Sequence, residues 1–170
     1  MSAAKPEIER KWLIDRPSEA LLAAQPDAAP SQIVQTYLLA EQGLSRRVRA
    51  RTADGITVCT RTTKRRIDAM TADEDEAIIS ADEYRALLAQ ADPACRPIEK
   101  TRWCIPYAGQ LLEIDLYPFW PHQAVLEIEL PSPDAAVCLP PWLTVRREVT
   151  GNRIYSNHSL SRAIPNEDDE

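Results

Sequence analysis

The sequence is poor in glycine and histidine, and its cysteines are scattered. Four of the 170 residues are glycine, with no glycine-rich stretch between a strand and a helix, which excludes a P-loop and a dinucleotide-binding fingerprint. Any bound phosphate must therefore be held by side chains. The cysteines at 59, 95, 104 and 138 form no Cys-x-x-Cys pair, and His122 and His158 lie far from them in sequence. We therefore expect reduced structural thiols and no zinc site.

Long apolar runs and an excess of positive charge are also absent. No segment approaches the ~20 apolar residues of a membrane span, and the start has no apolar stretch of signal-peptide length, so we expect a cytoplasmic protein. The net charge of −6 argues against binding to nucleic acid or to an anionic membrane. The length suits one domain, which we expect to span residues 1–164, followed by an acidic, disordered tail at 165–170.

Alternation of apolar and polar residues recurs along the chain and predicts a mainly antiparallel β structure with few helices. Strands are expected over residues 7–14, 33–39, 44–52, 56–63, 74–79, 98–105, 111–117 and 124–130. A helix is expected after Ser80, because Ser80 and Glu83 form a capping box. Shorter helices are expected after Pro17 and after Tyr155.

Paired carboxylates follow one face of three of these strands. Alternation puts Glu7, Glu9 and Lys11 on one side of the first strand, and the pairs Glu113 with Asp115 and Glu127 with Glu129 repeat the pattern. Each pair sets two carboxylates roughly 7 Å apart, so neighbouring strands could gather oxygen ligands around Mg²⁺ or Mn²⁺. The solvated face of a half-buried strand would show the same pattern, so a single pair leaves both interpretations open.

Basic residues form separate rows with the same spacing. They are Arg47 and Arg49 (with Arg51), Arg61 on the next strand, and Lys100 with Arg102. Such rows suit a polyanion such as triphosphate, and they also suit a solubilising outer face. Acidic and basic rows that stay separate favour a ligand of both charges, a metal ion with its phosphate. Periodicity does not decide whether this face is enclosed or meets solvent.

Taken in order, these motifs resemble the CYTH superfamily, the triphosphate tunnel metalloenzymes. Glu7-Ile8-Glu9-Arg10-Lys11 matches the family's Glu-x-Glu-x-Lys signature, and the similarity continues through residues 35–38, 47–49, 98–102, 113–115, 126–129 and 147–151 to 155–157. The resemblance implies an α+β, mainly β fold: a closed antiparallel barrel of about eight strands, an open-ended tunnel with charged residues inside and a few helices outside.

The resemblance also implies roles for individual residues. By position, the metal ligands are Glu7, Glu9, Asp115, Glu127 and Glu129, with Glu113 as a helper, and the ion is Mg²⁺ or Mn²⁺. The triphosphate-binding set is Lys11, Arg47, Arg49, Arg61, Lys100 and Arg102. Ala72 stands where the family has a basic residue, and Arg65 or Arg66 could substitute for it.

The implied activity is metal-dependent hydrolysis of a triphosphate. Inorganic tripolyphosphate is favoured because the few aromatic residues form no obvious site for a base or a thiazole ring. We expect Lys100 to act as general base, its pKa lowered by nearby cations such as Arg102, with Tyr37 orienting Lys100 or the water. A class IV-type adenylyl cyclase, a thiamine or nucleoside triphosphatase, and a non-catalytic triphosphate-binding module are the alternatives. A homodimer is expected by analogy only.

Overall fold

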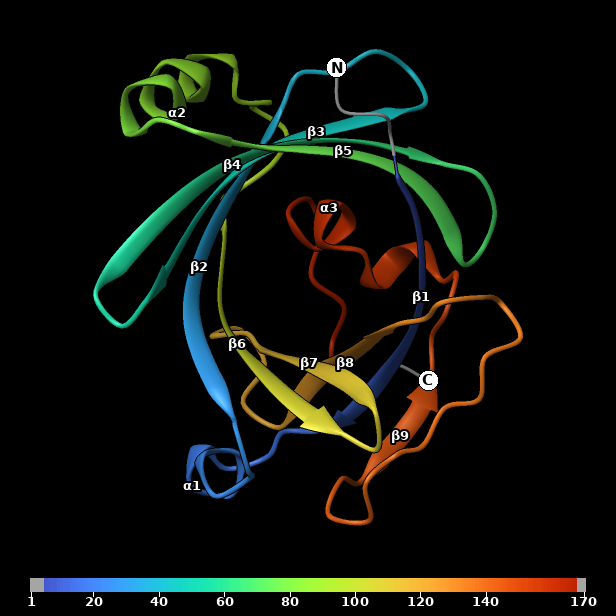
Figure 1. The fold of residues 1–170 in the computed structure, drawn as a ribbon. Helices are drawn as coiled ribbons and strands as arrows, with labels where there is room; N and C mark the ends of the chain where they lie inside the picture. The colour runs from blue at the N-terminus through green and yellow to red at the C-terminus, as the bar shows by residue number, and fades with distance from the viewer. Residues whose placement is uncertain (1–4, 168–170) are drawn as a thin grey trace.

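The computed structural model describes residues 5–167, whose strands form a closed antiparallel barrel (Figure 1). The strands are β1 (Lys5–Asp15), β2 (Ala29–Leu38), β3 (Leu44–Ala53), β4 (Ile56–Arg66), β5 (Thr71–Ile79), β6 (Ile98–Tyr107), β7 (Gln110–Leu116), β8 (Gln123–Glu129) and β9 (Val145–Glu148). Their order is β5-β4-β3-β2-β6-β7-β8-β1, and a β1–β5 pairing closes the ring. The predicted closed barrel and its eight strands are confirmed.

Strand β1 is shared between two partners on one of its edges. Its first part pairs with β5, from Lys5 opposite Glu74 to Ile8 opposite Thr71. Further along, Trp12 and Leu13 pair with β9. The short strand β9, which the sequence did not predict, therefore extends the wall outside the ring.

Residues with positive φ make the tight turns that join neighbouring strands. Asp54 (φ 50°) and Gly55 (φ 75°) connect β3 to β4, and Ala108 (φ 50°) and Gly109 (φ 72°) connect β6 to β7. Two consecutive residues in this region are the requirement of a type I′ hairpin, whose twist matches that of the strands.

The helices are short, and the predicted ones are confirmed. They are α1 (Glu19–Ala23), α2 (Ala81–Leu87) and α3 (Asn157–Leu160), with 3₁₀ turns at Leu88–Gln90 and Arg153–Tyr155. The Ser80 hydroxyl accepts a hydrogen bond from the Glu83 amide at 3.1 Å, as its capping position predicts. In the part of the chain that the structure describes, no helix has the length and hydropathy of a transmembrane span.

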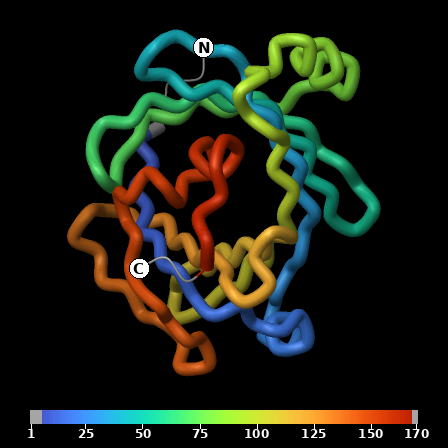
Figure 2. Tube along the Cα trace, turned by 180° about the vertical axis from the view of Figure 1, so that it is seen from behind, coloured from blue at the N-terminus to red at the C-terminus, as the bar shows by residue number. Residues whose placement is uncertain are grey.

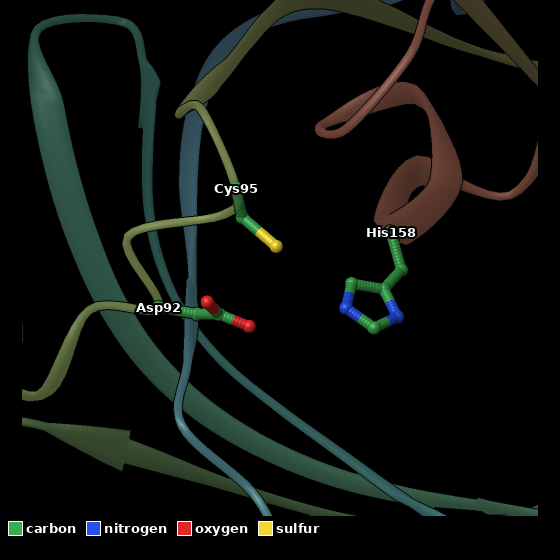
Figure 3. Close-up of side chains that lie close together, drawn as sticks. All are labelled: Asp92, Cys95 and His158. Carbon is green, nitrogen blue, oxygen red and sulfur yellow. The ribbon is translucent and has the colours of Figure 1, made fainter.

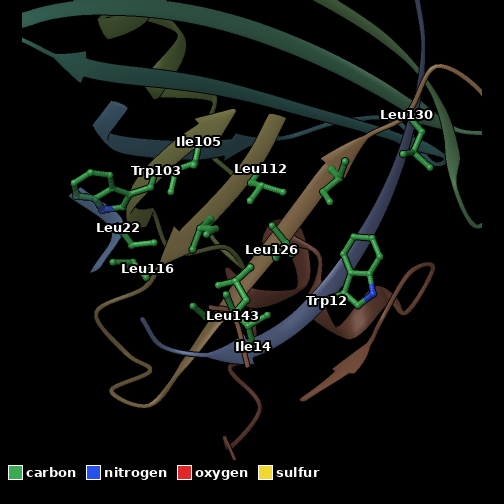
Figure 4. Close-up of a cluster of buried hydrophobic side chains, with 13 residues drawn as sticks. Trp12, Ile14, Leu22, Trp103, Ile105, Leu112, Leu116, Leu126, Leu130 and Leu143 are labelled. Atoms are coloured by element: carbon green, nitrogen blue, oxygen red, sulfur yellow. The ribbon is translucent and has the colours of Figure 1, made fainter. Parts of the chain in front are cut away.

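The larger apolar cluster lies on the outer face of the barrel wall (Figure 4). Trp12, Ile14 and Leu126 alternate with the charged residues of β1 and β8 and point away from the lumen. Leu22 of α1 and Leu143 from the β8–β9 connection cover them. The apolar core is outside because charged side chains occupy the interior.

A smaller apolar cluster closes one end of the barrel from within. Leu13 and Val125 of the wall pack against Tyr155 and Leu160 of the C-terminal segment, and Figures 1 and 2 show this segment, with α3, inside the ring of strands. A few helices were expected outside the barrel; α3 differs from them because it lies inside the ring. The rest of the barrel interior, beyond this apolar cluster, is a charged cavity.

The chain after α3 is held by the β7–β8 connection and by β9. The Trp120 indole donates a hydrogen bond to the Pro165 carbonyl at 3.0 Å, and Arg146 donates to the Glu167 carbonyl at 3.2 Å. Of the acidic tail expected at 165–170, residues 168–170 lie outside the described residues.

Candidate active site in the barrel lumen

The barrel encloses a cavity of about 570 Å³ with an unusual density of charge. Its carboxylates include Glu7, Glu9, Glu74, Glu113, Glu127 and Glu129, and its cations include Lys11, Arg47, Arg49, Arg51, Lys64, Arg66 and Arg102. Most of the residues that the sequence singled out therefore share one enclosed space. The exceptions are Arg61, Lys100 and Asp115, which are absent from the cavity lining.

Carboxylates crowd one side of the cavity, where β1 and β8 run side by side. Glu9 lies directly opposite Glu129, and Lys11 lies opposite Glu127 with a 3.0 Å ion pair. The charge of Glu127 and burial together raise the pKa of Glu9 to about 7. Burial acts to raise the pKa of Glu127 as well, but Lys11 and Arg102 lower it to about 2. Around Glu9, negative charge therefore exceeds what the neighbouring cations neutralise.

Strand β4 contributes Lys64, which the sequence interpretation missed. Its ammonium group lies 2.6 Å from Glu7 and 3.7 Å from Glu74. Thr62 and Lys64 face the lumen, so the alternating residue Arg61 is exposed on the outer face. The placement of Arg61 in the triphosphate set was wrong, and Lys64 takes its place in the lumen.

The basic residue sought near Ala72 is only partly replaced. Ala72 faces the cavity opposite Arg66, while the exposed Arg65 pairs with Asp73 on the outer face. Arg66 lines the cavity, but its guanidinium donates hydrogen bonds to the carbonyls of the β4–β5 turn at 2.9 and 2.8 Å. Arg66 is therefore the candidate substitute, held against its own hairpin.

Asp115 anchors an ion cluster in the cavity wall. One of its oxygens accepts from Arg102 Nε at 2.7 Å, and the other accepts from Lys100 Nζ at 2.7 Å and Arg102 Nη2 at 2.8 Å. Arg102 also forms an ion pair with Glu113. Both oxygens of Asp115 are thus engaged by cations, and its side chain has no exposed surface. The structure therefore places Asp115, predicted as a metal ligand, as the counter-ion of Lys100 and Arg102 and outside the cavity lining.

Lys100 is buried between Asp115 and the C-terminal segment. Its ammonium group also lies 3.4 Å from the Asn157 side-chain oxygen, which accepts a hydrogen bond from the Tyr117 hydroxyl at 2.7 Å. Burial lowers the pKa of Lys100 to about 7, with help from Arg102 and Arg49 and against the charge of Asp115. Asn157 lines the cavity, so it separates Lys100 from the lumen.

Guanidinium groups crowd the side formed by β3. Arg49 donates two hydrogen bonds to the side-chain oxygen (Oε1) of the buried Gln35, at 3.2 and 3.0 Å. The side-chain nitrogen (Nε2) of Gln35 donates to the Tyr37 hydroxyl at 3.2 Å. Burial, Arg47 and Arg102 lower the pKa of Arg49 to about 10. The Arg47 Nε atom is buried and has no hydrogen-bond partner among the described residues. An uncommitted buried donor next to repelling cations is suited to an anionic ligand.

Comparison with known proteins supports the resemblance seen in the sequence. No protein-family model and no curated protein matches the chain. A solved structure of the inorganic triphosphatase NE1496 matches with 27% identity over 97% of this chain and all of that chain, at a TM-score of 0.61. Another structure of NE1496 matches with 28% identity over 94% of this chain and 99% of that chain, at a TM-score of 0.59.

A more distant match shows the fold alone. The protein PH1819 from Pyrococcus horikoshii OT3 is 17% identical over 75% of this chain and 80% of that chain, at a TM-score of 0.57. On the strength of the two NE1496 structures, the chain is a structural match to the triphosphate tunnel proteins, and the predicted resemblance is confirmed.

Proposed function

We propose that this chain is a divalent-metal-dependent triphosphatase that hydrolyses inorganic tripolyphosphate in the barrel lumen. The observation that carries the proposal is a single cavity with a carboxylate-rich side on β1 and β8 and a guanidinium-rich side on β3. A metal–triphosphate complex presents the complementary pair of charges. The match to the inorganic triphosphatase NE1496 along nearly the whole of both chains supports it.

The carboxylates fit a hard cation. Glu7, Glu9, Glu127 and Glu129 offer oxygen donors only, the ligand type that Mg²⁺ and Mn²⁺ prefer. The pKa of Glu9 is raised to about 7 by its carboxylate neighbour and burial, which is the sign of negative charge that a cation would relieve. We assign the metal to these four residues with Glu113 nearby. When bound, the ion would neutralise phosphate oxygens and polarise the terminal phosphorus.

The cationic residues would hold the phosphate chain. Arg47 offers its free Nε donor, and Arg49 presents a guanidinium oriented by Gln35. Lys11 on β1 and Lys64 on β4 add two ammonium groups, each already paired with a glutamate. Phosphate oxygens would receive forked hydrogen bonds from the arginines and point charges from the lysines.

Lys100 is the proposed general base, with Tyr37 as the residue that orients the water. A pKa of about 7 leaves a useful fraction of Lys100 unprotonated near neutral pH. A water oxygen would attack the terminal phosphorus, its proton would pass to Lys100 Nζ, and pyrophosphate would leave. Because Asn157 separates Lys100 from the lumen, the proton path runs past the Asn157 side chain.

The lining favours a substrate without a base or a thiazole ring. Among the described residues around the cavity, the aromatic rings are Tyr37 and His158, which contact each other at a tilt of 35° with centroids 4.7 Å apart. They therefore do not form a pair of parallel faces between which a heterocycle could insert. Tripolyphosphate needs no such contact.

A phosphate-release panel tests the proposal. Tripolyphosphate, ATP, GTP and thiamine triphosphate are each supplied with Mg²⁺ or Mn²⁺, and cyclic AMP is measured in the ATP sample. We expect metal-dependent phosphate release that is fastest from tripolyphosphate. Cyclic AMP with pyrophosphate would instead indicate a cyclase, and tight binding without turnover would indicate a binding module.

A further inference from the structure

A second cluster of metal-ligand side chains lies at the rim of the lumen, apart from the carboxylates. Asp92 and Cys95 belong to the connection between the 3₁₀ turn Leu88–Gln90 and β6, and His158 belongs to α3 (Figure 3). One donor atom from each lies within 4.8 Å of the others, and all three residues are half-buried. Sequence separation had argued against a zinc site, but the fold removes that separation.

Two of the three donors are uncommitted. Within residues 5–167, neither the Cys95 thiol nor the ring nitrogens of His158 take part in a hydrogen bond, although the His158 ring contacts Tyr37 at a tilt of 35°. The oxygens of Asp92 accept one hydrogen bond each, from the Ala94 amide and from Arg162, both at 2.9 Å. A carboxylate oxygen has two lone-pair positions, so each keeps one for a cation.

The chemistry of the three donors selects a different ion from that of the lumen. One nitrogen, one sulfur and one oxygen form a set typical of Zn²⁺, whereas Mg²⁺ prefers oxygen alone. The thiolate and the carboxylate would together bring two negative charges to a divalent ion, and Arg162 is paired with the carboxylate from its other side. We propose that Asp92, Cys95 and His158 bind Zn²⁺ or a similar transition-metal ion, with a fourth position open to water.

A bound ion would link α3, which carries His158, to the connection before β6, which carries Asp92 and Cys95. The Arg96 amide already donates to the Ser161 carbonyl at 2.7 Å, and Arg162 pairs with Asp92, so the two segments are in contact without a metal. His158 follows Asn157, whose side chain contacts Lys100. An ion held by His158 would therefore also fix the residue that separates Lys100 from the cavity. The site itself rests on its own three donors and not on the proposed hydrolysis.

Cobalt titration of the reduced, metal-free protein distinguishes this site from the lumen. Co²⁺ bound through sulfur gives an intense thiolate-to-metal charge-transfer band, which oxygen ligands cannot give. We expect one equivalent of Co²⁺ to produce the band and Zn²⁺ to abolish it by displacement, with release of the Cys95 thiol proton. The band should persist in Glu9→Gln, which alters only the lumen, and in Cys138→Ser, which removes an exposed cysteine elsewhere.

The ligand variants decide the outcome. Cys95→Ser should remove the band, and His158→Ala should weaken Co²⁺ binding by at least about tenfold. Thermal melting without metal checks that each variant folds, and Zn²⁺ should raise the melting temperature of the wild type but not that of Cys95→Ser. The absence of a thiolate band in the folded wild type, or its survival in Cys95→Ser, would overturn the proposal.

Discussion

Replacing Asp115 with asparagine tests the ion cluster in the cavity wall. The substitution keeps the shape of the side chain but removes the charge that neutralises Lys100 and Arg102, both of which are buried. It also turns an amide group toward cationic donors where an oxygen accepted their hydrogen bonds. Glu113 still pairs with Arg102, so Lys100 loses the most.

The expected loss of stability is large. Removing one partner of a buried ion pair costs about 3–5 kcal/mol, since it leaves an uncompensated charge in the interior. Lys100, with a pKa already lowered to about 7 by burial, can limit this cost by releasing its proton. We therefore expect Asp115→Asn to lose about 3 kcal/mol at pH 7, more than a hundredfold in the folding equilibrium.

Denaturant unfolding of metal-free protein measures this loss. Asp82→Asn is the control, because the Asp82–Arg85 pair on α2 is exposed (90% and 67%) and should contribute about 1 kcal/mol or less. The pKa of Asp115 is held well below its usual range by Arg102 and Lys100, although burial opposes them. The stability that ionised Asp115 contributes is therefore fully present above its unfolded pKa of about 3.9 and declines as the pH falls below that value. The free energies of unfolding of the wild type and of Asp115→Asn should accordingly converge in acid.

If Asp115 were instead a metal ligand, the substitution should leave the stability of the metal-free protein nearly unchanged. Metal-free Asp115→Asn would then unfold at nearly the same denaturant concentration as Asp82→Asn, and only its Mg²⁺ affinity would fall. That result would refute the assignment of Asp115 as a counter-ion.

Three further predictions concern the lumen. Metal-free Glu9→Gln should have the melting temperature of the wild type near pH 4 and a higher one at pH 8. Glu127 and burial raise the pKa of Glu9 to about 7, so ionising Glu9 costs stability as the pH rises from about 4.5. Equal melting temperatures at pH 8 would contradict this. Arg49→Ala should lower kcat/KM for tripolyphosphate about 10- to 100-fold through a lost charge-assisted hydrogen bond, whereas a change of more than twofold in the outer-face control Arg61→Ala would count against the corrected set. Lys100→Arg should lower kcat by about 10²–10⁴ and remove the acid limb of the rate profile near pH 7, where Lys100 gains its proton, and a persisting limb would exclude it as base.

The strands were predictable because the apolar periodicity is strong where the wall packs against the outer core, whereas closure into a barrel was implied only by the family resemblance. Trp12, Ile14, Leu126 and Ile128 mark the outward face of β1 and β8 without ambiguity. Strand β9 escaped prediction because Val145–Glu148 is short and mostly exposed, with no apolar alternation.

The same cue explains the error on β4. That strand carries threonine and arginine on both faces, and α2 contacts its outer side, where Cys59 is buried. Periodicity therefore did not indicate which residues of β4 face the lumen, and the predicted strand ended at residue 63, one position before Lys64.

Other features depend on contacts between distant segments. Glu113 and Asp115 share a strand face, but only the position of Arg102 opposite Asp115 makes the latter a counter-ion. Asn157 and His158 reach the lumen because the C-terminal segment enters the barrel, which no local pattern announces.

The alternation of β1 and β8, with carboxylates inward and apolar side chains outward, constrains how such a barrel can change. Inserting or deleting one residue within a strand would exchange the two sets, so that glutamates would face the outer apolar cluster and tryptophan would face the lumen. Single replacements at inward positions leave the outer layer untouched. We therefore expect barrels of this kind to diverge in ligand choice by point substitution at fixed strand length, with insertions confined to the connecting loops.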